Sequence, residues 1–171
     1  MRVLVALLIL SLGACAPVPA PTEPGGSSEP ARPSGIPPSG KPDPEGEARL
    51  AENRARWTAQ QPDTYRFTYT RNCFCPQEYR GPFAIAVQGG EVAEVTYEGE
   101  GEPIEDALTN ASLTIDDLFD LVAEAYERKA FSVTVDYAET GQPTNIYIDY
   151  NAQIADEEVG FTIEPVRPAG D

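Results

Sequence analysis

The sequence predicts an α+β domain in which helices pack on one face of an antiparallel sheet. Two segments have the spacing of amphipathic helices, and six short segments alternate apolar and polar residues as strands do. Their order is helix, three strands, helix, three strands. Successive strands with short connections favour antiparallel pairing. The repeated order leaves a diverged tandem repeat open, although the two halves share too few residues to argue for one.

The first half is predicted to contain one helix and three strands. Residues 47–60 carry apolar side chains at helical spacing, and Pro62 ends that helix. In the next segment Tyr65, Phe67 and Tyr69 share one face, because strand side chains two residues apart point the same way. The Gly89-Gly90 pair is typical of a tight hairpin. The three strands are expected at 65–70, 83–87 and 91–97.

The second half begins after an acidic, glycine-containing segment, 98–110, that we expect to be a loop. Thr114 is a typical helix N-cap, and Asp117 stands three residues later, where a capping box places its acidic partner. The amphipathic helix that they start ends near Arg128 and Lys129, which suits the helix dipole. Three alternating strands are expected at 131–137, 146–150 and 159–163.

The N-terminus, residues 1–14, is typical of a signal peptide. Val3–Leu12 is almost wholly apolar, and its ten residues would span about 15 Å as a helix, too short to cross a bilayer. Small residues then precede Cys15, an arrangement that resembles the lipobox of bacterial lipoproteins, whose cysteine is lipidated. The alternative is an ordinary signal cut at Ala14 or Ala16, with the cysteine incidental. We expect Cys15 to carry the lipid.

Residues 15–46 are predicted to tether the lipidated cysteine to the domain. The stretch 16–46 holds ten of the 17 prolines and almost no large apolar side chain. Such a segment buries too little surface to offset its ordering entropy, so we expect disorder with polyproline II character. At about 3.1 Å per residue it reaches at most roughly 95 Å. Residues 47–171 then form a single domain.

Composition excludes several classes of function. Nine of the 12 Lys/Arg and 24 of the 28 Asp/Glu lie in 47–171, which gives this domain a net charge of −15. Nucleic acid is therefore not an expected partner, since its phosphates require clustered cations. The chain contains no histidine. That absence excludes nucleophiles activated by histidine and metal sites with histidine ligands.

Two cysteines remain once Cys15 is assigned to the anchor. Cys73 and Cys75 are separated only by Phe74. Outside the cytoplasm such a pair favours a disulfide. In a flat strand the two Cα atoms would be about 6.6 Å apart, near the upper limit for a bridge, so a bulge or turn is required. The alternatives are buried thiols, a redox-active pair, or thiolate ligands for Cu(I) or Zn(II).

The second candidate site is a set of carboxylates in the C-terminal half. If the apolar residues of the last three strands face the core, Asp136, Asp149 and Glu158 project from the opposite face. Oxygen ligands of this kind suit Ca²⁺, although the chain has no EF-hand loop. The set could also supply the acid and base of a glycosidase, or form a solvated face that keeps the sheet soluble.

One series of residues runs through the whole domain: Trp57, Tyr65-Arg66-Phe67, Cys73-Phe74-Cys75, Val135-Asp136-Tyr137, Gly141-Gln142-Pro143-Thr144, Ile148-Asp149 and Asp156-Glu157-Glu158. With these residues the chain resembles an uncharacterised family of bacterial lipoprotein domains, domain of unknown function 6174, over about 50–164. The family favours an aromatic residue before the proline of the turn. Gln142 departs from that pattern, and we expect the departure to affect only the turn surface.

The resemblance implies an exported, often lipid-anchored domain without an assigned activity. It also implies that Cys73, Cys75, Asp136, Asp149 and residues 156–158 belong to one pattern. We expect a non-catalytic binding or interaction module in the bacterial cell envelope, facing the periplasm or the exterior. Its expected partners are the membrane, through the lipid, and an envelope protein. A thiol redox or metal-handling protein and a calcium-responsive acidic module are the alternatives.

Overall fold

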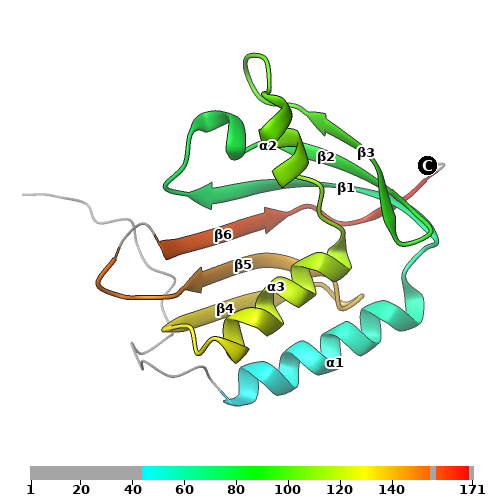
Figure 1. Cartoon of the computed structure of the whole chain (residues 1–171). Helices are drawn as coiled ribbons and strands as arrows, with labels where there is room; N and C mark the ends of the chain where they lie inside the picture. Colours follow the sequence, from blue (N-terminus) through cyan, green and yellow to red (C-terminus); the bar gives the residue numbers. More distant parts are fainter. Residues whose placement is uncertain (1–43, 155–156, 170–171) are drawn as a thin grey trace, which may run out of the picture. The chain divides into compact units, whose positions relative to one another are not determined.

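The computed structural model describes residues 44–154 and 157–169 (Figure 1). The predicted signal peptide, Cys15 and most of the predicted tether lie outside these residues. In the described part no helix is long and apolar enough to cross a membrane.

The predicted α+β fold is confirmed, and its predicted order of helix, three strands, helix and three strands is present with a short helix, a 3-10 helix and a two-residue strand in addition. The elements are α1 (Pro44–Gln60), β1 (Thr64–Cys73), the 3-10 helix η1 (Gln77–Tyr79), β2 (Phe83–Gln88), β3 (Glu91–Tyr97), α2 (Glu105–Asn110), α3 (Ile115–Glu127), β4 (Ser132–Tyr137), β5 (Pro143–Asp149), β6 (Glu158–Ile163) and β7 (Arg167–Pro168). The prediction of a loop over 98–110 is wrong at its end, where α2 forms. This helix has only six residues, too few to show a helical period in the sequence.

The strands form one antiparallel sheet in the order β3-β2-β1-β6-β5-β4, with β7 also paired to β1. Each half is a three-stranded meander, and β1 joins the halves by pairing with β6. Figure 1 shows α1 and α3 side by side on one face of the sheet. Equivalent strands of the two halves run in opposite directions, so a rotation that superposes one meander on the other also turns the sheet over. In a true repeat α1 and α3 would therefore lie on opposite faces, whereas they lie on the same face. What repeats is therefore the order of elements.

The core lies between the helices and the inner face of the sheet. Tyr65, Phe67 and Tyr69 of β1 share this face, as predicted, and all three side chains are buried. Trp57 of α1 packs edge-on against Tyr65, with ring centroids 5.5 Å apart. Edge-to-face contacts of this kind add to the stabilisation that burial of the rings provides. The other face of the sheet, which we call the outer face, carries Thr68, Ala84 and Ala86 on the first meander.

The N-terminus of α3 has the predicted capping box. The backbone N–H of Asp117 donates to Thr114 Oγ1 at 3.0 Å, and the Asp117 carboxylate accepts from the Thr114 N–H at 2.7 Å. Both donors would lack an intrahelical partner without these bonds. The box fixes where α3 begins and therefore which of its residues face the sheet.

The turn between β4 and β5 connects three parts of the domain. Gly141 has a φ of +85°, and a Cβ there would overlap the backbone carbonyl oxygen of Asn53 in α1. Gln142 beside it is only 2% exposed. Its Nε2 donates to the Glu164 carbonyl at 2.7 Å, and its Oε1 accepts from the Val166 N–H at 2.9 Å. The expectation that Gln142 affects only the turn surface is therefore wrong, because its side chain holds the chain between β6 and β7.

Candidate functional site

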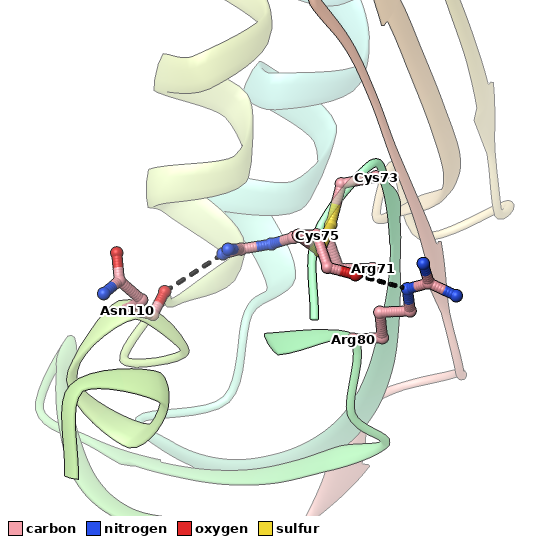
Figure 2. Close-up of a disulfide and its surroundings, with 5 residues drawn as sticks. All are labelled: Arg71, Cys73, Cys75, Arg80 and Asn110. Carbon is pink, nitrogen blue, oxygen red and sulfur yellow. Dashed lines mark hydrogen bonds between the residues drawn. A yellow bond between two sulfur atoms is a disulfide. The ribbon is translucent and has the colours of Figure 1, made fainter. Parts of the chain in front are cut away.

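Cys73 and Cys75 are joined by a disulfide at the point where β1 ends (Figure 2). Their Cα atoms are 5.2 Å apart, closer than the roughly 6.6 Å of a flat strand. The chain bends at Phe74 and Cys75, as a bridge between positions 73 and 75 requires. While the bridge is intact neither sulfur is a thiolate, so the pair does not offer thiolate ligands to Cu(I) or Zn(II).

Two arginines flank the disulfide, one on each side (Figure 2). Arg80 Nε donates to the Cys75 carbonyl at 3.0 Å, and the Arg80 carbonyl accepts from the Arg71 N–H at 2.8 Å. Arg71 Nη2 donates to the Asn110 carbonyl at the end of α2 at 3.0 Å. The Arg71 guanidinium also lies 5.3 Å from the ring centroid of Phe161 in β6. These contacts attach the end of β1, where the disulfide lies, to β6 and to α2.

The 3-10 helix η1, which follows the disulfide, is also attached to α2. The Tyr79 hydroxyl donates to the Asp106 carboxylate in α2. This hydrogen bond to the neutral phenol, with smaller contributions from desolvation and from the charges of Asp106 and Glu78, raises the pKa of Tyr79. The hydroxyl therefore stays protonated and able to donate throughout the neutral range.

Phe74 lies between the bridged cysteines and is 81% exposed, the most exposed large apolar side chain of the described residues. We call Cys73–Cys75 the Phe74 tip. A side chain of this kind normally loses exposure by folding inward, but here the disulfide and the Arg80 contact fix the backbone on both sides. The tip is thus a preorganised apolar projection in a domain of net charge −15. The cysteine spacing indicated a bend but not the direction in which Phe74 points.

The three candidate carboxylates do not converge. Asp149 and Glu158 are cross-strand neighbours on β5 and β6, whereas Asp136 lies opposite Asn145, which precedes Asp149 by four residues on β5. Four residues of strand correspond to about 13 Å. Asp149 is nevertheless buried, and its Oδ1 accepts from the Asn151 N–H at 2.8 Å. In the described part of the chain no three His, Cys, Asp or Glu side chains are grouped to hold a metal ion.

A hollow of about 510 Å³ lies on the outer face of β1, β2 and β3, beside the chain segment 164–169. Its floor includes Thr68, Ala84, Ala86 and Thr96, and its walls carry Arg66, Arg167, Glu94, Glu98 and Glu164. The sequence alone did not indicate this surface. Its residues come from four strands, and only the pairing register shows that they are adjacent.

These features define a small α+β domain with one helix-covered face, one open face, and a disulfide-bonded tip at the end of its central strand. The chain belongs to the family of unknown function DUF6174, whose model matches residues 49–168. This match covers nearly the whole described domain and confirms the resemblance found in the sequence. No curated protein and no solved structure matches the chain.

Proposed function

We propose that the chain is a lipid-anchored, non-catalytic binding module of the bacterial cell envelope that contacts a partner protein through the Phe74 tip. One observation carries this proposal: Phe74 is 81% exposed although the loop around it is fixed by a disulfide. An aromatic ring left in water forgoes about 1.5–3 kcal/mol of burial free energy, which a partner with an apolar pocket would recover. Aromatic anchors of this kind dominate the energy of many interfaces.

The restricted backbone of the Phe74 tip also favours partner binding. A flexible loop loses conformational freedom on binding, at about 0.5–1.5 kcal/mol for each immobilised side chain. The disulfide and the hydrogen bond from Arg80 to Cys75 restrict the backbone before any partner arrives. The Arg80 side chain is exposed beside Phe74 and adds a cation at the rim. The partner pocket is therefore expected to be apolar with carboxylates at its edge, as interface cores and rims generally are.

Replacing Phe74 by alanine is expected to abolish partner binding and to leave the melting temperature within about 2 °C of wild type, because the side chain packs against little of the domain. Crosslinking in intact cells with a photoreactive phenylalanine at position 74 captures the partner, and binding to that partner and thermal melting are then measured for the alanine variant. The matched control carries the same group at Ile104, another exposed apolar position. A discrete protein adduct is expected at 74 and not at 104. Equal adduct patterns at both positions would refute the tip as the contact.

The lipid anchor is supported by the sequence, in which an apolar stretch at 3–12 and small residues precede Cys15. Two or three acyl chains give stable membrane attachment at about 0.8 kcal/mol for each buried CH₂. Replacing Cys15 by serine is expected to prevent incorporation of labelled palmitate and to release the protein from the membrane fraction. Ser11→Ala, a change within the same N-terminal segment, is the control that should retain the label. A Cys15→Ser protein that still incorporates palmitate would show that another group is acylated.

A further inference from the structure

We propose that the hollow on the outer face of β1, β2 and β3 binds short linear peptides by their free ends, with the C-terminal carboxylate on Arg66 and Arg167. This inference is independent of the Phe74 tip, since the two surfaces share no residue. It rests on three features of the described residues: the small side chains of the floor, the pairing of two arginines, and the position of Glu98 away from both arginines along the strands.

The floor of the hollow is made by small residues where larger ones would be expected. On β2 the inner face carries Phe83, Ile85 and Val87, whereas the outer face carries Ala84 and Ala86. Alanine is disfavoured in strands, where β-branched residues fit better. Ala84 lies between Thr68 of β1 and Thr96 of β3 in the pairing register. Two alanines on the open face of an internal strand therefore leave room above the sheet.

Arg66 and Arg167 lie directly opposite each other on β1 and β7. Like charges in this position normally repel, and here each arginine has a glutamate beside it that offsets the repulsion. Arg66 is 4.0 Å from a Glu94 carboxylate oxygen and Arg167 is 3.6 Å from one of Glu164. Both distances exceed those of hydrogen bonds. Each arginine thus has a loose, solvent-exposed ion pair with a glutamate of the hollow, and the arginine side chains are 67% and 75% exposed. Among the described residues neither guanidinium donates a hydrogen bond, so a ligand carboxylate can take the place of these ion pairs.

The opposite end of the hollow carries Glu98 and neither of the two arginines. Arg66 is in register with Ala86 and Glu94, and Glu98 follows Glu94 by four residues, which corresponds to about 13 Å along the strand direction. A fully extended chain of four residues spans about the same length. In backbone register, a tetrapeptide therefore matches the separation between the arginine end and Glu98, and we place its carboxylate at the arginines and its ammonium group at Glu98. Thr68 and Thr96 line the path between these ends with hydroxyl groups.

The test uses tetra-alanine as the probe and the full chain in detergent, labelled with ¹⁵N and followed by NMR. Saturable shifts are expected for the backbone amides of Thr68, Ala84 and Thr96. Tetra-alanine amide, which lacks the carboxylate, is expected to bind at least tenfold more weakly, as is N-acetyl tetra-alanine, which lacks the ammonium group. Phe74→Ala should leave the dissociation constant unchanged, so the result is separate from that of the tip.

Two substitutions in the hollow test the proposal in different ways. Arg66→Gln removes one fork and should raise the dissociation constant for tetra-alanine about tenfold or more. Ala84→Leu fills the floor and should abolish the shifts, while its melting temperature shows that the sheet is intact. The absence of saturable shifts with tetra-alanine, equal binding of the amidated peptide, or unchanged binding by a folded Ala84→Leu protein would each overturn the proposal. Equal binding of the peptide blocked at both ends would show that internal protein segments are the ligand, and would overturn it as well.

Discussion

Replacing Gln142 by alanine is expected to lower the free energy of unfolding by about 2–4 kcal/mol. The substitution removes two hydrogen bonds, one to the Glu164 carbonyl and one from the Val166 N–H, each worth about 1 kcal/mol net. It also leaves a space where a side chain only 2% exposed was packed. The chain between β6 and β7 then loses its connection to the β4–β5 turn, so the effect should exceed that of a typical surface substitution.

Chemical denaturation of the purified protein measures this change, and a second glutamine supplies the control. Gln60 Nε2 also donates to a carbonyl of the same turn, that of Thr140 at 3.0 Å, but this bond is exposed to water. Gln60→Ala should therefore change the free energy of unfolding by no more than about 0.5 kcal/mol. If Gln142→Ala proves as mild as Gln60→Ala, the buried amide does not hold the C-terminal segment.

Alkaline pH is expected to lower the free energy of unfolding of the domain between about pH 10 and pH 12. Burial raises the pKa of Tyr65 and of Tyr69 to about 12, although a hydrogen bond from Ile115 and the charge of Arg71, respectively, act in the opposite direction. An unfolded tyrosine ionises near pH 10. The folded state therefore keeps protons that the unfolded state releases, and stability that is complete below pH 10 is lost as the pH rises towards 12.

Each of these tyrosines should reduce the free energy of unfolding by about 1.4 kcal/mol per pH unit in that range. Circular dichroism at a series of urea concentrations gives the free energy, and absorbance of tyrosinate reports ionisation. The double variant Tyr65→Phe, Tyr69→Phe should show a shallower dependence on pH above 10, measured against its own stability at pH 8. A slope equal to that of wild type would mean that other groups control the alkaline transition.

The local features of the fold could be predicted from the sequence. The alternation of Tyr65, Phe67 and Tyr69 gave their shared inner face, and Thr114 with Asp117 gave the start of α3. These predictions succeed because the signal lies within a few residues of the feature. A helix as short as α2 carries no such signal, since six residues make less than two turns.

The sites depend on contacts between residues far apart in the chain, which the spacing of residues in the sequence does not reveal. Gln142 bonds to residues 22 and 24 positions later, and the departure from the family pattern gave no indication of that burial. Asp136 and Asp149 share a sheet face, but the register of β4 with β5 decides that they lie far apart. Arg66 and Arg167 are 101 positions apart and meet only because β7 returns to β1. Spacing along the chain determines which face of the sheet a side chain lies on. The register between strands determines which side chains are its neighbours.

The pairing of β1 with β6 has a consequence for how the domain is made. A chain that emerges N-terminus first presents β1 long before Glu158–Ile163 arrives to cover its second edge. The packing of α1 is delayed in the same way, because α1 contacts α3 and β4, which belong to the second half. Contacts so distant along the chain form late and make folding slow. The newly made protein is therefore expected to stay unfolded until almost all of it is available.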